Sequence, residues 1–485
     1  MTPMQGFAPD SDPNTPGILI DCSNIIPFES GLKGAPTAVN TAAAVLAAPC
    51  TGAVVATQLS GVRRVFAGTL PRLYELAANL WVDRTRAAGV YTGGTDTRWS
   101  FCQFGDTTIA SNLADAMQSS VAGVFADIAT APKAKLVVSA TNNFVIAFNT
   151  SDATFGASPD RWWCCAQADQ TNWTPAVTTL ATTGRLVAVE GQIQAALTLG
   201  DYVIAYKNRA IFLGTFVGSP VVWQWALVPG GEAGVVGQEA VCDIGGAHFF
   251  VGNDNFWLFD GTRPLPLGNG VVRQWFLNNS SASYRYRTKA IYDRQNNLVR
   301  IFFASNASTG LVDSCLVWHV LTKQWGRADV TIQAPLVYIS PGVTIDGLNA
   351  YAATIDALPN IPVDSQFWIA GGQVPAYFDV VNQLVSLTGA TGASSFTTSD
   401  SGDDDIVSDI ERFRVRYTQR PTTAIAMGFY KQNEGDALIT GPSNAINDGK
   451  FDIRQSARFH RIRVDMTSNH KETGYDVKLK PSGER

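Results

Sequence analysis

The sequence carries little charge for its length. Only 16% of its 485 residues are Asp, Glu, Lys or Arg, against roughly 25% in an average soluble domain. The net charge of −5 lacks the basic excess of proteins that coat nucleic acid. It still permits a conduit along which DNA slides, because a conduit that must release DNA needs few phosphate contacts.

Long apolar runs are also missing. The most apolar stretch, residues 41–59, is interrupted by Pro49 and Gly52 and falls short of the roughly 20 residues that span a membrane. The first ten residues lack the basic start and apolar core of a signal peptide. We therefore expect a soluble protein with no membrane anchor, made in a cytoplasm.

The cysteines form no recognisable metal or disulfide pattern. There are seven, an odd number, and neither a C-x-x-C pair nor the Cys/His spacing of a zinc site occurs. Cys164 and Cys165 are adjacent in a Trp-rich stretch, which is typical of small core residues. We expect reduced, buried thiols.

Catalytic motifs are absent from the sequence. It contains no G-x-S-x-G elbow, no Walker loop and no H-E-x-x-H pair. Its histidines stand apart from one another, which favours structural roles over metal ligation: His248, His319, His460 and His470. We expect a protein that is not an enzyme, with no catalytic residues, no cofactor and no metal site.

One carboxylate stretch leaves an alternative open. Residues 151–163 weakly match the aspartate box of sialidase propellers, but Asp152 and Gly156 are misplaced and no second copy exists. A pair of catalytic carboxylates cannot be assigned from this pattern. The alternative function is therefore a carbohydrate-binding or depolymerising β-propeller.

Short apolar segments alternate with tight turns along most of the chain. Four stretches each predict a β-hairpin, because Gly, Asn or Asp at the turn tolerates positive φ: residues 63–81, 200–216, 247–261 and 289–304. Residues 314–326 continue the last of these hairpins and close on Trp325. Regular repetition of such hairpins is typical of a sandwich, barrel or propeller.

Aromatic residues recur within these hairpins. Tyr74 and Trp81 are seven residues apart, as are Trp318 and Trp325. We expect each tryptophan to pack between adjacent sheets, where burial of about 150–250 Å² contributes roughly 4–6 kcal/mol before opposing terms. The predicted blade residues are Tyr74, Trp81, Trp99, Trp173, Trp257, Trp318 and Trp325.

These patterns predict an all-β protein in three parts. Residues 1–60 are rich in Pro, Gly and Asn and are expected to be an extended N-terminal arm that orders on a partner surface. Residues 61–390 are expected to form an irregular β-propeller, with six blades as the first choice, and residues 391–485 a small antiparallel β-domain. Residues 387–405 look like a linker, and residues 113–128 fit either a helix or an irregular surface segment.

Charged residues near the C-terminus are the candidate interface or DNA-channel residues. Asp403, Asp404 and Asp405 form an acidic run that we interpret as a solvated loop, with a divalent-cation site and an acidic channel rim as alternatives. Two strands carry arginines on one face: Arg412, Arg414 and Arg416, then Arg461 and Arg463. Protein contacts are favoured over phosphate, because the aromatic residues lie on the opposite face and offer no stacking platform.

Residues 61–112 resemble the opening blade of the tail nozzle, or packaged-DNA stabilisation, proteins of short-tailed bacteriophages. The resemblance lies at Arg63, Arg64, Gly68, Thr69, Leu73, Tyr74, Trp81, Trp99, Phe101, Phe104, Gly105, Asp106 and Asn112. Two further stretches are similar to that family, at Trp162, Trp163, Asp169, Asn172 and Trp173, and at Gly474, Gly483 and Arg485. The Ala-rich segment 41–57 and the Cys164-Cys165 pair are departures from it.

The resemblance implies a structural protein of the virion tail, made in the host cytoplasm. Such tail hub proteins form a homo-oligomeric ring, usually a hexamer, below the portal and its adaptor. The ring continues the DNA channel without sequence-specific binding, retains packaged DNA until ejection, and anchors tail fibres or tailspikes. A head-decorating β-protein is a third class, which copy number per particle would distinguish.

Overall fold

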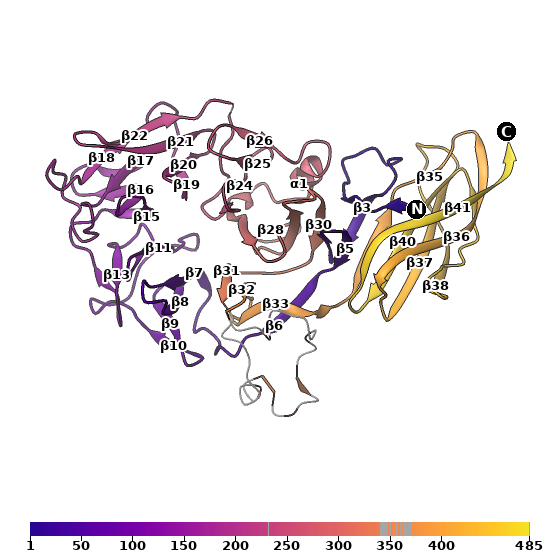
Figure 1. Cartoon of the computed structure of the whole chain (residues 1–485), viewed down its shortest axis with the longest axis horizontal. Coiled ribbons are helices and arrows are strands. Elements are labelled where there is room, and N and C mark those ends of the chain that lie inside the picture. The colour runs from indigo at the N-terminus through magenta and orange to yellow at the C-terminus, as the bar shows by residue number, and fades with distance from the viewer. Residues whose placement is uncertain are drawn as a thin grey trace.

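The computed structural model describes residues 1–230, 232–339 and 371–484, with residues 348, 351, 352, 354, 357, 358, 361 and 368 between them. The chain folds into a β-propeller and a β-sandwich that lie side by side (Figure 1). The named helical elements of the described residues are α1 (Arg273–Asn279) and the 3₁₀ turn η1 (Arg285–Arg287). None of the helices described is long and apolar enough to cross a membrane.

The described part of the propeller contains seven antiparallel four-stranded blades. The first three are β7 (Cys50–Thr57), β8 (Arg63–Thr69), β9 (Leu73–Ala77) and β10 (Leu80–Asp83); β11 (Ser100–Phe104), β12 (Thr107–Ser111), β13 (Gln118–Ser120) and β14 (Ala126–Asp127); and β15 (Lys133–Ala140), β16 (Phe144–Asp152), β17 (Gly156–Cys164) and β18 (Thr182–Arg185).

The remaining four blades follow in chain order, except for one strand. They are β19 (Ile193–Leu199), β20 (Tyr202–Lys207), β21 (Ile211–Gly218) and β22 (Val222–Leu227); β23 (Val241–Asp243), β24 (His248–Val251), β25 (Phe256–Phe259) and β26 (Pro264–Pro266); β27 (Lys289–Asp293), β28 (Leu298–Phe303), β29 (Ser314–His319) and β30 (Trp325–Ala328); and β31 (Ala334–Ile339), β32 (Gln373–Phe378), β33 (Leu384–Thr391) and β6 (Pro36–Asn40).

The strand β6 closes the ring. It precedes the first blade in sequence but pairs with β33 as the outer strand of the last blade. The innermost strands contact one another in order, and β31 returns to contact β7. The last blade is therefore assembled from two segments that lie far apart in the sequence, and no contiguous repeat contains all four of its strands.

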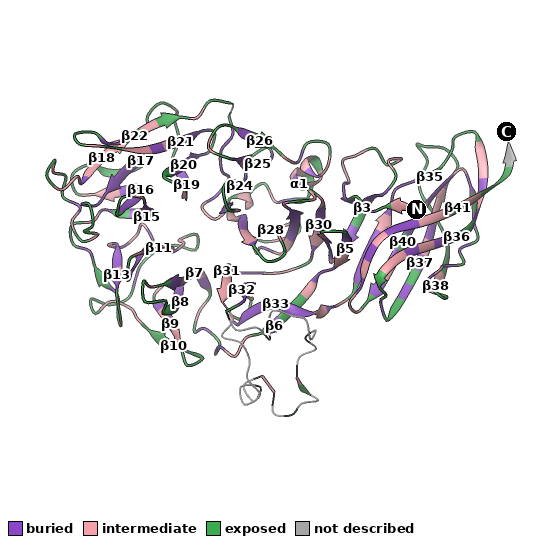
Figure 2. Cartoon of the chain, in the orientation of Figure 1, coloured by how far each residue is buried: buried purple, intermediate pink, exposed green. Residues whose placement is uncertain are grey.

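The hydrophobic core of the propeller lies between neighbouring blades, as the buried strand interiors in Figure 2 show. Trp318 of β29 stacks on Phe249 of β24 with ring centroids 5.5 Å apart, which joins two adjacent blades. Trp99 fills the space between the first two blades, where a Cβ on Gly68 would lie 2.2 Å from the indole Cδ1. At these two joints the tryptophans pack between neighbouring blades.

The sandwich has two sheets that share a buried core with the propeller's fourth, fifth and sixth blades. One sheet contains β5 (Gly31–Gly34), β41 (Lys471–Glu484), β36 (Ile406–Gln419), β39 (Ser456–Ala457) and β1 (Thr2–Pro3). The other contains β2 (Gly6–Phe7), β3 (Ile18–Ser23), β34 (Ser394–Thr398), β35 (Ser401–Gly402), β40 (Phe459–Thr467), β37 (Thr423–Lys431) and β38 (Ile439–Ala445).

The N-terminal segment joins the two modules. Strands β1, β2 and β3 belong to the sandwich, and β4 (Ile25–Phe28) pairs with both β30 and β5. One ten-stranded sheet thus runs from the propeller into the sandwich. The expectation of an arm that needs a partner surface is wrong for residues 2–40, because their partners are strands of the same chain.

Two local predictions also change. The expected linker at residues 387–405 is largely the buried strands β33 and β34, because Ser, Thr and Gly side chains are small enough to pack there. Its acidic end, residues 402–405, is exposed, as is Ala393 between the two strands. Residues 113–128 form no helix and contain the short strands β13 and β14.

Candidate functional site

Charged side chains meet across the ring at the start of the innermost strands. Glu239, just before β23, lies within ion-pair distance of Lys289 at the start of β27, and its Oε2 is 3.7 Å from Nε of Arg98, just before β11. Arg287 Nη2 lies 2.6 Å from Asp96 Oδ1. We call these five residues the axial ion cluster. The pairs link the second blade with the fifth and sixth, which lie across the ring.

Burial makes this cluster energetically demanding. The side chain of Lys289 is 1% exposed, and burial lowers its pKa although the nearby Glu239 carboxylate acts in the opposite direction. Burial alone would raise the pKa of Asp96, but hydrogen bonds from Arg287 and Tyr286 outweigh it and lower that pKa. The cluster therefore depends on each ion keeping its partner.

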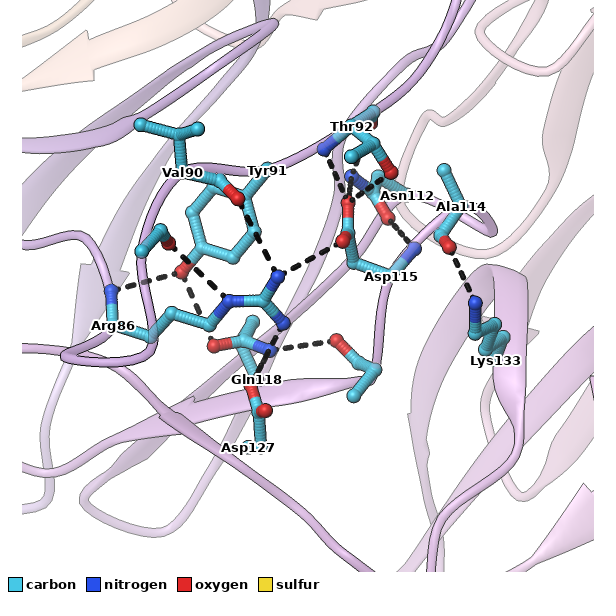
Figure 3. Close-up of polar contacts among 12 residues, drawn as sticks. Arg86, Val90, Tyr91, Thr92, Asn112, Ala114, Asp115, Gln118, Asp127 and Lys133 are labelled. Atoms are coloured by element: carbon cyan, nitrogen blue, oxygen red, sulfur yellow. Dashed lines mark hydrogen bonds and ion pairs between the residues drawn. The ribbon is translucent and has the colours of Figure 1, made fainter.

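A second polar network surrounds residues 86–92, which precede Asp96 and Arg98 in the chain (Figure 3). Arg86 donates to Asp115 Oδ1 at 2.9 Å and to Asp127 Oδ1 at 3.1 Å. The same Asp115 accepts from the backbone N–H of Thr92 at 2.7 Å and from Nδ2 of Asn112 at 3.1 Å. These contacts anchor both ends of residues 86–92 to the second blade.

The axial ion cluster joins separate blades, whereas the Arg86 network holds the segment before the second blade against that blade. In the axial ion cluster, the Glu239 carboxylate is engaged by Lys289 and Arg98; in the Arg86 network, Asp115 is held by a cation and two further donors. Sequence reasoning missed both networks. In the axial ion cluster, Arg98 and Glu239 are separated by well over a hundred positions, and in the other network Arg86 and Asp115, 29 positions apart, match no local motif.

The predicted C-terminal charges lie on the sandwich. Asp403, Asp404 and Asp405 are exposed in the turn between β35 and β36. Arg461 donates to the buried Asp400 at 2.8 Å, and Arg463 pairs with Asp465 at 2.9 Å.

The arginine ladder of β36 lies on the outer face of its sheet. Phe413 and Val415 are buried, whereas Arg412 is exposed and Arg414 half-buried, as the alternation predicted. Arg416 Nε donates to Asp476 Oδ2 at 2.6 Å. Among the described residues, Arg412 and Arg414 have no ion-pair partner.

The predicted blade residues lie mainly in the cores between blades. Trp81 reaches across to the last blade, where its ring centroid is 5.5 Å from that of Phe378 and its Nε1 donates to the Ala44 carbonyl at 2.8 Å. The others belong to four hydrophobic clusters. Tyr74 shares the cluster of Trp81, Trp99 lies between the first and second blades, and Trp173 lies between the second and third. Trp257, Trp318 and Trp325 belong to the largest cluster.

The cysteines and histidines are structural in placement. Six cysteines are buried and Cys102 is half-buried, and all seven are free thiols. The histidines are all buried and hydrogen-bonded, to Tyr206 for His248, Thr322 for His319, Ser408 for His460 and Glu472 for His470. In the part of the chain that the structure describes, no three His, Cys, Asp and Glu side chains are grouped to hold a metal ion.

Buried histidines should make the fold acid-sensitive. Burial lowers the pKa of His248 and His460 below the ordinary 6.5, so the folded state disfavours their protonation. Above pH 6.5 both histidines are neutral in the folded and the unfolded state, so their full contribution to stability is present. As the pH falls from 6.5 toward the lowered pKa, the free energy of unfolding decreases by at most about 1.4 kcal/mol per pH unit for each histidine. The melting temperature should fall as the pH is lowered through this window, and His248→Gln should make the melting temperature depend less steeply on pH. If the pH dependence stayed the same in that variant, His248 would not be a source of the acid sensitivity.

Comparisons with known proteins give only distant likenesses. No family model and no curated protein matches the sequence. Among solved structures, it is similar to PorZ, a surface component of the type-IX secretion system of Porphyromonas gingivalis, at 10% identity and a TM-score of 0.36, over 77% of this chain and 44% of PorZ. It is also similar to BBS1N in complex with ARL6DN, at 7% identity and a TM-score of 0.30, over 50% of this chain and 71% of that one. The chain thus spans less than half the length of PorZ, and neither likeness carries a functional argument.

Proposed function

We propose that this chain is a structural subunit of a ring at the tail tip of a short-tailed bacteriophage. In this function, copies of the chain, six by the resemblance, continue the DNA channel below the portal and adaptor. The ring retains packaged DNA and anchors fibres or tailspikes. It acts mechanically, without a chemical step.

The observation that carries the proposal is the continuous ten-stranded sheet between the propeller and the sandwich. A ring that restrains packaged DNA needs subunits whose parts do not swing apart. Here β4 pairs with the propeller strand β30 on one side and with β5 on the other, and β5 pairs with β41 of the sandwich. The two modules are therefore built as one rigid body.

The motif that resembles the nozzle family supports the same function. Gly68 and Trp99 meet in the joint between the first two blades, and Arg64 in that motif pairs with Glu75 at 2.6 Å with both side chains largely buried. These are packing residues of a rigid part. Exposed apolar side chains of the first blade, such as Leu59 (82% exposed) in the turn after β7 and Leu80 (62%) at the start of β10, offer surface that a large ring interface would cover.

Imaging of the purified full chain tests the proposal. We expect annular assemblies of one copy number, formed by the chain alone or on addition of portal and adaptor proteins. A glycan-binding screen on the same preparation tests the alternative, a sugar-binding or depolymerising propeller. Single subunits under every condition would overturn the proposal, and strong sugar binding or glycan cleavage would favour the alternative.

A further inference from the structure

The outer face of the β36–β41 ribbon carries a strip of positive charge. Paired residues of an antiparallel ladder point to the same face, and the register places Arg412 opposite Lys478 and Arg414 opposite Asp476. The inward face of the same ribbon holds Phe413, Val415 and Tyr475 in the sandwich core. The basic strip, as we call it, consists of Arg412, Arg414, Arg416, Lys478, Lys480 and the amino group of Met1.

Carboxylates neutralise only part of this strip. Glu411 lies 2.5 Å from Lys478, and Asp476 binds both Arg416 and the Met1 amine, the latter at 2.9 Å. Burial alone would raise the pKa of Asp476, but those two cations outweigh it and lower that pKa. With Asp409 opposite Lys480, six positive groups face three carboxylates, in a chain whose net charge is −5.

The geometry of the strip suits a polyanion with regularly repeating charges. Alternate residues of a strand are about 6.8 Å apart, so Arg412, Arg414 and Arg416 place three guanidinium groups along about 14 Å. Each DNA strand carries a phosphate about every 3.4 Å along the helix axis. Guanidinium groups bind phosphate oxygens through planar, bidentate contacts.

We propose that the basic strip is the surface of this chain that faces double-stranded DNA, through phosphates and without sequence preference. This inference rests on the proposed tail-ring function and identifies the sandwich, rather than the hole of the propeller, as the wall of the conduit. The axial ion cluster crosses that hole. Partial neutralisation by Glu411 and Asp476 keeps the contact weak, which suits a duct from which DNA must leave.

The second arginine ladder provides the matched comparison. Arg461 and Arg463, on the outer face of the other sheet, each lie beside a carboxylate, Asp400 and Asp465 respectively. Arg463 has a side chain 44% exposed, so Arg463→Gln removes one positive charge from the sandwich without touching the basic strip.

The test measures binding of the full-length protein, both as isolated and in assembled rings, to a short blunt DNA duplex of mixed sequence over a range of salt concentrations. We expect weak binding whose affinity falls with salt. The double variant Arg412→Gln/Arg414→Gln should bind several-fold more weakly. The slope of the logarithm of the binding constant against the logarithm of the salt concentration should be smaller in magnitude by about 2, because each lost phosphate contact removes about 0.9 from it. Lys478→Gln/Lys480→Gln should act in the same direction, whereas Arg463→Gln should bind like the parent protein.

The outcomes separate the two proposals. Parent protein that does not bind the duplex, or strip variants that bind like Arg463→Gln, would overturn the basic strip as the DNA-facing surface while leaving ring formation intact. Failure of the parent chain to form rings, both alone and with portal and adaptor proteins, would overturn the tail-ring function whatever the duplex result. A thermal melt of each variant confirms folding, and the lysine variant decides the outcome if the arginine variant unfolds.

Discussion

Replacing Glu239 with Gln should destabilise the protein by about 3 kcal/mol. The substitution leaves the Lys289 ammonium buried, 1% exposed, without its carboxylate, and removing one partner of a buried pair typically costs about 3–5 kcal/mol. The lower end is expected because the Glu239 side chain is 26% exposed. Urea unfolding followed by far-ultraviolet circular dichroism measures the loss.

The pH dependence of this loss of stability tests whether the unpaired Lys289 ammonium causes it. Without Glu239, the pKa of Lys289 in the folded state should fall further below 10.5, its ordinary value. The folded state then binds fewer protons than the unfolded state, so the deficit should shrink as the pH is raised toward 10.5. The control Glu232→Gln removes a carboxylate that is 80% exposed, 3.5 Å from Arg209, and should cost less than about 1 kcal/mol. A similar loss in both variants would rule out the axial ion cluster as a joint.

Replacing Trp318 with Ala should cost about 3–5 kcal/mol. Its indole is 2% exposed and packs between Phe249 of the neighbouring blade and Trp325, with centroids 5.5 Å and 6.3 Å away. Truncation leaves a cavity at a joint between rigid sheets, which cannot collapse easily to fill it. The urea midpoint should fall markedly when unfolding is followed by circular dichroism.

Leu321→Ala is the matched control for this prediction. Leu321 lies in the turn between β29 and β30 and is 64% exposed, so its truncation should change stability by no more than about 0.5 kcal/mol. If Trp318→Ala behaved like Leu321→Ala, the tryptophan would not be holding the two blades together.

The sequence predicted the parts of the fold that depend on local chemistry. The hairpin at residues 289–304 is predictable because Asn, which tolerates positive φ, stands between two apolar segments. In the structure Asn297 adopts a positive φ between the two strands. The alternation around Phe413 was visible because a half-buried strand has period two. Such signals lie within a few residues of one another, so they can be read without the fold.

Long-range pairings could not be read in this way. Nothing near residues 36–40 indicates that β33, some 350 positions away, is the partner of β6. The Ser, Thr and Gly residues of β33 and β34 resemble a linker in composition, and only tertiary packing makes them strands. The axial ion cluster is hidden for the same reason, because Arg98 and Glu239 become neighbours only when the ring closes.

The strand that closes the ring also sets an order of events during synthesis. Residues 36–40 leave the ribosome before any blade exists, yet their partner β33 ends at Thr391, and chains are made at about 5–20 residues per second. Strands β2 and β3 remain without their sheet for longer still. They extend the sheet of β34, β40 and β37, and β40 ends only at residue 467. For tens of seconds the growing chain holds an open arc of blades whose first and last edges are unpaired, so the ring of blades closes only after its last blade has been made.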